Sequence, residues 1–393
     1  GNASLINSES GVLYAEIAAL ADDQTNRIIS LSDGTGNNQV LILYQLGSNI
    51  LRVGFQVANQ TDIVIDVNTN TTLISKIAVN YNSTSVKFYL NGSKVGETST
   101  GYTFSSNVLD NLSFSYGSGI LPFYGKTKAL AVYKTALTDA NLRSLTYPSA
   151  VATTFDLNFN TIADDFTFTR GSEATFVNAQ GLIQSTASND APRLDYSTGA
   201  EAFLLEPQST NLITQSELFS DAYWTKSGSS VVSGFTSPSG GLSAFKLVED
   251  TSTGLHSVAK INFNVIAEKY SASIYVKPNG RNEVRLTLDN YFQYPTYTTF
   301  NLDTGIVTLS AEAENGKIET LQNGWFRCSF TSKSVAIAGS GGKLFIQTSV
   351  NSNTPYQGDG TSGVYIYGAQ VEQNSYATSY IPTSGASATR NQE

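Results

Sequence analysis

The most informative part of the sequence is Ser85-Val86-Lys87-Phe88-Tyr89-Leu90-Asn91-Gly92-Ser93-Lys94-Val95. Val86, Phe88 and Leu90 are two residues apart, so in an extended strand they lie on one face. Asn91-Gly92 supplies the two positive-φ positions of a type I′ turn, which joins antiparallel strands. The stretch therefore predicts a β-hairpin, and with it an antiparallel sheet in this part of the chain.

Alternating apolar residues extend on both sides of this hairpin, across residues 11–133. Short stretches such as Val40-Leu41-Ile42-Leu43-Tyr44 are separated by Gly, Asn and Asp. Strands at this spacing are typical of an antiparallel sandwich or barrel. A helix is predicted at 139–145, where Thr138 can cap the first turn. Pro148 then ends this pattern, so we place the first domain at 1–148.

The rest of the chain divides into three further regions. Residues 149–210 contain few strands, so we expect a connector that packs against a neighbour. The strand rhythm resumes over 211–383, which predicts a second sandwich, most simply a jelly roll. Residues 384–393 are predicted to be a flexible tail. The expected fold class is all-β, with two antiparallel β-sandwiches joined by a β-rich connector.

The composition of the 393 residues excludes several classes of function. There are 23 Lys and Arg against 32 Asp and Glu, a net charge of −9, and no basic cluster. Nucleic-acid binding is therefore not expected, because it depends on clustered Lys and Arg. No apolar run approaches the roughly 20 residues that span a bilayer, so membrane insertion is not expected. One histidine and one cysteine exclude a His/Cys zinc cage and an intrachain disulfide.

Catalytic chemistry has little support in the residues. A Ser-His dyad would need His256, which we interpret as an exposed residue at a strand end, and no Gly-x-Ser-x-Gly sequence occurs. Cys328 lies in an apolar alternating strand and is expected to be a buried, inert thiol. Glu312 and Glu314 could share one face of a strand, but their surroundings favour a solvated turn. We therefore expect no enzyme.

Sugar binding suits the composition better. Aromatic rings stack on the apolar face of a sugar, while amide, carboxylate and guanidinium groups bond its hydroxyls. The densest group of such residues lies at 289–297, with two arginines upstream. Alternatively, the same aromatics fill the core, a reading that we favour for Trp224, and the loop at 351–360 is an ordinary polar turn. The candidate carbohydrate-binding residues are Tyr291, Tyr294, Tyr297, Arg281, Arg285, Trp224, Tyr356 and Asp359.

No cofactor is required by any of these patterns. Calcium is the one metal that hard oxygen ligands could hold without His or Cys. Asp33-Gly34, followed by Asn37-Asn38, is a candidate for a structural Ca²⁺ site. Asp-Gly is equally an ordinary turn sequence, and both interpretations stay open.

Several segments carry a resemblance to known proteins. Residues 123–142, which begin Phe123-Tyr124-Gly125 and end Ala140-Asn141-Leu142, resemble the laminin-G/concanavalin A-like lectin domains of bacteriophage virion proteins, as does the opening 11–20. Phe168-Thr169-Arg170-Gly171-Ser172, Leu204-Leu205-Glu206-Pro207-Gln208 and residues 363–382 are similar to segments of phage tail-fibre and head-fibre proteins. Those proteins carry a jelly roll like that of carbohydrate-binding modules.

This resemblance implies a non-catalytic virion protein, a fibre or surface appendage that adheres to host or environmental glycans. Its location would be the virion surface, and its partners glycans and other virion proteins. Fibres are often trimers, so a homo-oligomer is expected, although no heptad repeat marks one. Because the chain begins Gly1-Asn2-Ala3 without Met, we expect a piece of a longer modular fibre.

Two alternatives to adhesion remain. The first is a purely structural or decoration protein of the virion. The second is a polysaccharide-cleaving enzyme of the concanavalin A-like class, which would need paired carboxylates. The nearest match to such a motif is Glu201-Ala202-Phe203-Leu204-Leu205-Glu206, where Phe203 replaces the expected Asp.

Overall fold

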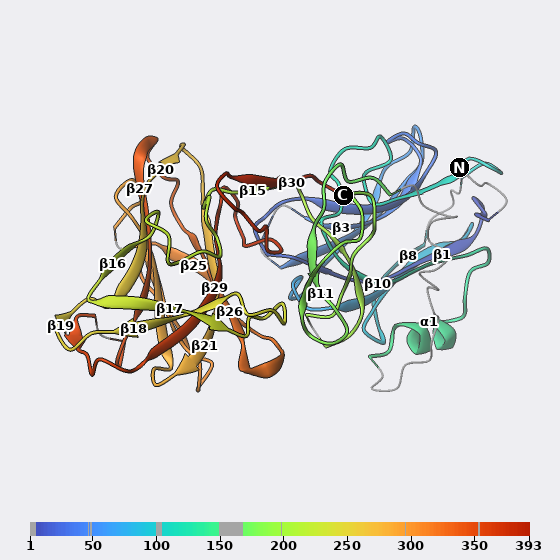
Figure 1. The fold of residues 1–393 in the computed structure, drawn as a ribbon. Helices are drawn as coiled ribbons and strands as arrows, with labels where there is room; N and C mark the ends of the chain where they lie inside the picture. The colour runs from blue at the N-terminus through green and yellow to red at the C-terminus, as the bar shows by residue number, and fades with distance from the viewer. Residues whose placement is uncertain are drawn as a thin grey trace. The chain divides into compact units, whose positions relative to one another are not determined.

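The computed structural model describes residues 5–45, 47, 49–99, 104–148, 168–197, 199–294, 296–352 and 354–393. These residues form antiparallel sheets with one short α-helix, and the predicted all-β class is confirmed (Figure 1). The chain divides into two compact units. The first unit comprises Gly1–Phe168 and Ala202–Glu206, and the second comprises Thr169–Glu201 and Pro207–Glu393.

The first unit is built from two antiparallel sheets. One sheet has the order β14-β10-β1-β6-β7-β8, and the other has the order β5-β4-β3-β2-β9. The strands of the first sheet are β14 (Ala202–Leu205), β10 (Gly125–Tyr133), β1 (Gly11–Ala19), β6 (Ser75–Tyr81), β7 (Ser85–Leu90) and β8 (Ser93–Ser99). Those of the second are β5 (Ile63–Asn68), β4 (Ile50–Gln56), β3 (Gln39–Tyr44), β2 (Arg27–Ser32) and β9 (Asn111–Ser113).

Two local predictions are confirmed in the first unit. Strands β7 and β8 form the expected hairpin, with φ of 46° at Asn91 and 82° at Gly92. Helix α1 (Asp139–Thr146) begins after Thr138, whose side chain accepts a hydrogen bond from the Asn141 N–H. Leu142 of this helix packs against β1, β6 and β7. The helix therefore covers part of one outer face of the first unit.

The second unit contains two six-stranded antiparallel sheets, with the orders β16-β20-β27-β22-β23-β24 and β17-β18-β29-β21-β26-β25. The strands of the first sheet are β16 (Thr225–Ser227), β20 (Ser257–Val265), β27 (Gly339–Thr348), β22 (Glu283–Asp289), β23 (Tyr297–Asn301) and β24 (Val307–Leu309). Those of the second are β17 (Ser229–Phe235), β18 (Ala244–Glu249), β29 (Gly363–Glu372), β21 (Ser271–Asn279), β26 (Phe326–Ser332) and β25 (Ala313–Thr320).

Short elements complete the second unit. They are the pairs β11 (Thr175–Val177) with β12 (Ile183–Ser185), β15 (Ser209–Asn211) with β30 (Ala388–Arg390), and β19 (Thr253–Gly254) with β28 (Tyr356–Gln357), together with β13 (Leu194–Asp195) and the 3₁₀ turn Gln322–Gly324. Among the described residues, no helix is long and apolar enough to cross a membrane.

The predicted connector and tail are organised differently in the structure. Within the predicted connector, residues 149–167 lie outside the described residues, 169–201 belong to the second unit, and Ala202–Leu205 pairs with β10 of the first. The prediction of a flexible tail at 384–393 is wrong, because Ala388–Arg390 forms β30 and pairs with β15. Polar composition suggested disorder, but the charged side chains of this segment have partners inside the protein.

Those partners form a buried charge cluster in the second unit. Arg170 Nη1 and Arg193 Nη2 lie 3.0 and 2.5 Å from Glu393 Oε1, and Arg390 Nη1 lies 3.6 Å from Glu393 Oε2. All four side chains are at most 1% exposed. Removing one partner from a buried charge group leaves the others without compensation, which is strongly destabilising. Glu393 therefore ties the last residues of the chain to the segment that follows residue 168.

We predict that Glu393→Gln lowers the free energy of unfolding of the second unit by about 3–5 kcal/mol, because it leaves buried guanidinium groups without their anion. Urea unfolding followed by tryptophan fluorescence measures this loss, since Trp224 and Trp325 both lie in the second unit. Glu173→Gln, at an exposed position of the same segment, is the control and should change stability by less than about 0.5 kcal/mol. Equal stability of the two variants would contradict the role of Glu393.

Candidate functional site

A groove with a volume of about 190 Å³ lies on the outer face of the five-stranded sheet in the first unit. Its floor is apolar. Ile28, Leu41 and Leu43 form a cluster of their own with the Tyr116 ring, and Val64 adds an exposed apolar side chain. Apolar surface that is concave and accessible is typical of ligand sites.

Polar groups border this floor. Arg52 donates two hydrogen bonds to the Asp66 carboxylate, at 2.6 and 2.7 Å, and Gln56 donates one to Asp62 at 2.7 Å. The Tyr116 hydroxyl lies 3.2 Å from the Gln56 side-chain oxygen. The bidentate contact raises the pKa of Arg52 and lowers the pKa of Asp66, so both groups stay charged. The rim thus offers guanidinium, carboxylate, amide and phenol groups beside an apolar surface.

Gly54 keeps the middle of the groove open. It pairs with Leu41 on one side and with Val64 on the other. A Cβ atom at this position would lie 3.0 Å from the Leu41 side chain, closer than ordinary van der Waals contact. A larger residue here would fill the floor and displace Leu41.

Sequence reasoning missed this groove. The apolar run of β3 is typical of a strand buried on both faces, so it gives no sign that Leu41 and Leu43 line a groove. The signal that could have found it is Gly54 within the apolar strand Ile50–Gln56, because a glycine inside a strand often marks a close approach or an open site.

Three of the predicted binding residues come together on the second unit. The Arg285 guanidinium lies 4.3 Å from the centre of the Tyr297 ring. Tyr294 is 79% exposed. The structure therefore brings Arg285 and Tyr297 into contact and leaves Tyr294, in the same segment, exposed to solvent.

Two other predicted residues pack against the core, Trp224 completely buried and Tyr291 partly so. Trp224 is 1% exposed and packs against Phe219, with ring centres 4.9 Å apart. Tyr291 packs against the core and against Gly339, where a Cβ atom would collide with its ring. Trp224 as a stacking platform is therefore wrong, and the alternative of a core residue is correct.

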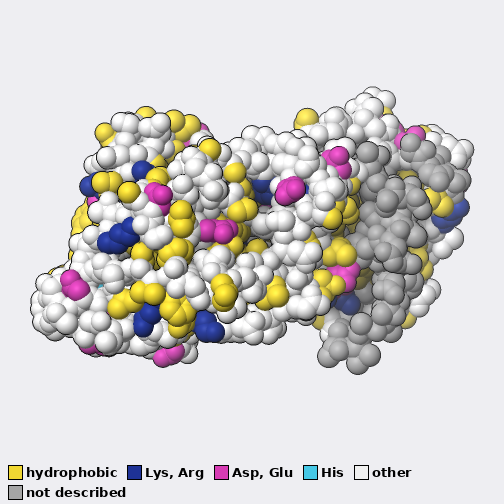
Figure 2. Space-filling model, in the orientation of Figure 1, with side chains coloured by type: hydrophobic (Ala, Val, Ile, Leu, Met, Phe, Trp, Pro, Cys, Tyr) yellow, Lys and Arg dark blue, Asp and Glu magenta, His cyan; other side chains and the backbone are white. Residues whose placement is uncertain are grey.

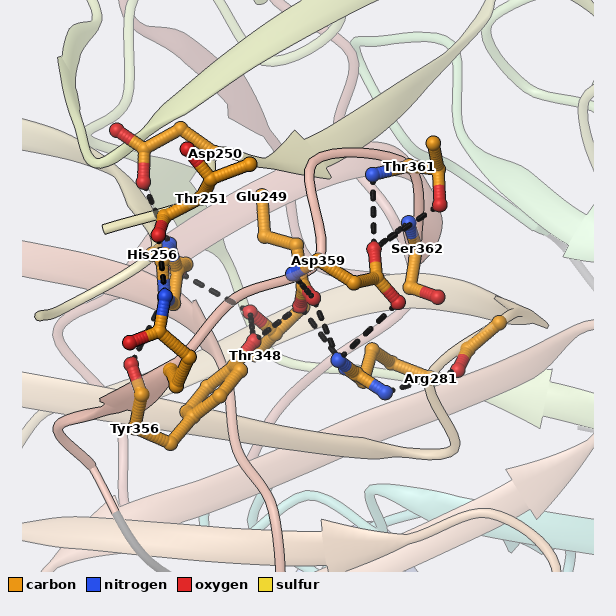
Figure 3. A network of polar contacts seen from close by, with 12 residues as sticks. Glu249, Asp250, Thr251, His256, Arg281, Thr348, Tyr356, Asp359, Thr361 and Ser362 are labelled. Carbon is orange, nitrogen blue, oxygen red and sulfur yellow. Dashed lines mark hydrogen bonds and ion pairs between the residues drawn. The ribbon is translucent and has the colours of Figure 1, made fainter. Parts of the chain in front are cut away.

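Arg281, Tyr356 and Asp359 meet in a polar network around Glu249 (Figure 3). Arg281 donates to both Glu249 oxygens at 2.9 and 2.5 Å, the Tyr356 hydroxyl donates to Glu249 at 2.6 Å, and the Asp359 N–H donates at 2.8 Å. The Glu249 side chain is fully buried. Its hydrogen bonds raise the pKa of Arg281, and burial with the bond to Glu249 raises the pKa of Tyr356 to about 12. The polar groups of this network therefore bond mainly to one another.

His256 extends this network and corrects a prediction. Expected at an exposed strand end, it is fully buried. Nδ1 lies 2.6 Å from the Gly228 carbonyl oxygen and Nε2 lies 3.2 Å from that of Tyr356, whose ring packs on the imidazole at 4.6 Å. Both ring nitrogens face backbone carbonyl oxygens, and the N–H of the ring donates to one of them, so His256 is part of the packing between these segments and is not placed to act on a substrate.

The remaining candidates make ordinary structural contacts. Asp33 accepts hydrogen bonds from the Thr35 N–H, the Thr35 hydroxyl and the Asn38 amide. Burial raises the pKa of the Asp33 carboxyl, but these hydrogen bonds outweigh that effect, so its pKa is lowered overall. Within the described part of the chain, no three His, Cys, Asp or Glu side chains are grouped to hold a metal ion. Cys328 is buried and free, as expected, and burial raises the pKa of its thiol. Glu314 pairs with Lys269, 2.6 Å away.

Comparison with known families gives one match. Residues 6–143 match the family model of the concanavalin A-like lectin/glucanase superfamily. These residues lie within the predicted lectin-like first domain, so this part of the chain is similar to that family. No curated protein sequence matches the chain.

Several solved structures are similar to this chain. The CBM40 module of the Ruminococcus gnavus IT-sialidase bound to α2,3-sialyllactose is 15% identical, covers 35% of this chain and 83% of its own, with a TM-score of 0.30. Domain 4 of a Geobacillus stearothermophilus arabinanase, in complex with arabinotriose, is 13% identical to this chain. The match covers 37% of this chain and 69% of the arabinanase domain, with a TM-score of 0.31. Domains LG4-5 of mouse laminin α1 are 8% identical to this chain. The match covers 98% of this chain and 88% of the laminin domains, with a TM-score of 0.31.

The network in Figure 3 predicts a pH dependence of stability. In the unfolded chain a tyrosine loses its proton near pH 10, whereas folded Tyr356 retains it up to about pH 12. The stabilising contribution of Tyr356 is therefore complete below pH 10 and is lost as the pH rises toward 12. We expect Tyr356→Phe to be less stable than wild type at pH 8, and the difference to narrow at pH 11.

Urea midpoints at the two pH values measure this difference. Tyr294→Phe, which removes an exposed phenol, is the matched control and should follow wild type at both. A constant difference between wild type and Tyr356→Phe would show that the phenolic proton does not contribute.

Proposed function

We propose that this chain is a non-catalytic glycan-binding protein, and that the groove of the first unit holds the sugar. The observation that carries the proposal is the groove itself: an apolar floor around Gly54 with a polar rim, on a domain that matches the lectin/glucanase family model. A pyranose has an apolar C–H face and a periphery of hydroxyl groups, so it needs both kinds of surface at once.

The surface of the protein suits neutral polar ligands. Only 14% of the residues are charged, and Figure 2 shows the charged side chains scattered over the displayed face between neutral and hydrophobic ones. Recognition of sugar hydroxyls uses neutral and charged hydrogen-bonding groups and needs no titratable catalyst.

The groove carboxylates support binding over catalysis. Asp62 and Asp66 are four residues apart along extended chain, which places them about 13 Å from each other. Glycosidases hold their two carboxylates about 5–5.5 Å or 6.5–9.5 Å apart. Both aspartates are also engaged, one by Gln56 and the other by Arg52. A polysaccharide-cleaving enzyme is the alternative, and release of reducing ends from a bound polysaccharide would establish it.

The biological setting that we propose is the surface of a bacteriophage virion, with the chain acting as part of a fibre or appendage. The support is the resemblance of residues 123–142, 168–176, 204–212 and 363–382 to segments of phage fibre proteins. In that setting weak sites gain strength from multiple copies, such as a trimer, through effective concentration. No cofactor is required, and a structural calcium remains a proposal. Absence of its peptides from purified virions would contradict this setting.

We predict that Gly54→Val weakens glycan binding at least about tenfold, because the new side chain fills the groove floor. A glycan array identifies the ligand, and isothermal titration calorimetry on the full chain measures the affinity. Gly241→Val is the matched control, since a Cβ atom there meets no atom closer than 4.0 Å.

Gln56→Ala provides a second variant that removes a rim amide without adding volume. It should weaken binding less than Gly54→Val and leave the melting temperature within a few degrees of wild type. If neither variant changes the affinity for any glycan that the wild type binds, the groove is not the site. If the wild type binds no glycan, a purely structural virion role is favoured.

A further inference from the structure

The outer face of the β16-β20-β27-β22-β23-β24 sheet carries two rows of side chains that the strand register defines. One row runs across the strands as Tyr297, Thr287, Phe345, Ala259 and Thr225. The next row runs as Thr299, Arg285, Gln347, Ser257 and Ser227. Directly opposed residues are about 5 Å apart, so each row is a strip of about 20 Å. In the first row the partly exposed rings of Tyr297 and Phe345 alternate with small residues. In the second row Thr299, Gln347 and Ser257 are buried, whereas Arg285 is partly exposed.

Arg285 is central to this face and has an unusual set of partners. Its guanidinium donates to the Thr299 hydroxyl at 3.0 Å, the Thr354 hydroxyl at 2.8 Å and the Ser352 carbonyl at 2.6 Å. All three acceptors are neutral. A guanidinium has five N–H donors, so two remain for another acceptor. Its position is fixed by these bonds and by the Tyr297 ring beneath it.

The nearby acidic groups do not neutralise Arg285 by contact. Among the described residues, no carboxylate forms an ion pair with it, whereas Arg52 and Arg281 are each paired with an acid. Glu283, two residues away on the same face, uses its oxygens for Asn301, Ser349 and Ser352. Arg285 is partly buried, and this burial lowers the pKa of its guanidinium.

Asp289 and Lys343 also belong to this face, where they are directly opposed across β22 and β27. Their charges are opposite, so together they add no net charge to it. Glu283 and Arg285 also carry opposite charges, but the oxygens of Glu283 are occupied by Asn301, Ser349 and Ser352. Arg285, beside the Tyr297 ring, is thus a cation of this face with N–H donors left for a ligand. A partly desolvated guanidinium with two available donors is suited to a carboxylate, which it can hold by two parallel hydrogen bonds.

We infer that this face is a second saccharide site, distinct from the groove, that selects a sugar bearing a carboxylate, such as a uronic or sialic acid. Arg285 receives the carboxylate, Tyr294 and Tyr297 contact the apolar face of that sugar, and Thr287, whose hydroxyl bonds to the buried Gln347 side chain at 3.2 Å, faces an adjoining hydroxyl group. The inference rests on the proposed glycan-binding function and specifies an acidic ligand class for the second unit.

The test compares an acidic saccharide with its uncharged counterpart on the full chain. The Gly54→Val variant is used as background, so that the groove does not contribute. The probes are tetragalacturonate and 3′-sialyllactose, each compared with its own methyl ester, which differs from it only at the carboxylates. We expect at least one acid to bind at least about tenfold more tightly than its uncharged partner, since hydrogen bonds to charged groups are strong.

Arg285→Gln should remove this preference and bring the acid to the affinity of the uncharged partner. Arg285→Lys keeps the charge but lacks the planar fork, so it should retain only part of the preference. Because Arg285 also holds the 352–354 loop, each variant's melting temperature is measured, and the lysine variant serves if the glutamine variant unfolds. Lys343→Gln is the control that removes a nearby charge without affecting the preference.

Three outcomes decide the matter. Selection for an acid that depends on Arg285 supports the inference, and the pair that shows it distinguishes uronic from sialic acid. Equal binding of acids and uncharged partners, or a preference that persists in both Arg285 variants, overturns the inference but leaves glycan binding intact. Failure of both the groove and this face to bind any saccharide overturns the proposed function as well.

Discussion

The alternation of side chains along a strand is the constraint on which this structure depends. Each strand of a two-sheet sandwich gives half of its side chains to the core, so function is confined to the outer faces and the loops. In the first unit helix α1 packs on one outer face through Leu142, whereas the opposite sheet carries the groove around Gly54. Covering one face with a helix thus leaves the other sheet as the broad surface for a ligand.

Charged side chains in the second unit serve two different purposes, and their partners decide which. Arg281 is held by the buried carboxylate of Glu249, and Arg170 and Arg193 by that of Glu393. These pairs are structural, because breaking them leaves a charge in a medium of low dielectric constant. Arg285 instead has neutral acceptors and retains donor capacity. Arginine is therefore a structural residue where it pairs with a buried carboxylate, whereas Arg285 keeps N–H donors for a ligand.

Local features were predictable from sequence because they depend on neighbouring residues. The Asn91-Gly92 turn and the Thr138 cap follow from backbone preferences over a few residues, and both are confirmed. The burial of His256 and the ordering of the tail were not predictable. His256 is covered by residues 28 and 100 positions away, and Arg390 pairs with a strand some 180 residues earlier. Contacts at such separations depend on register between distant strands, which one sequence does not reveal.

For the candidate sites too, contacts between residues close in sequence were predictable, whereas contacts that depend on strand register were not. Arg285 and Tyr297 were singled out because they are close in sequence, and their meeting across β22 and β23 follows from the antiparallel return of the chain. Trp224 was included for its residue type alone, and the structure buries it. The groove needs the register of three strands around Gly54 before its floor exists. Residue type indicates what a site could bind, but strand register decides which residues form one.

The net charge of −9 places a physical limit on how an acidic saccharide would be selected. At ionic strengths near 0.1 M, charges more than about 10 Å apart are largely screened, so the chain as a whole neither attracts nor strongly repels a distant anion. Discrimination must then arise on contact, where Arg285 and the ligand exclude water from a short-range pair. Selection of this kind acts mainly on the dissociation rate, because electrostatic steering, which accelerates association, is absent. A protein of this composition would therefore gain firm attachment by presenting several copies of each weak site.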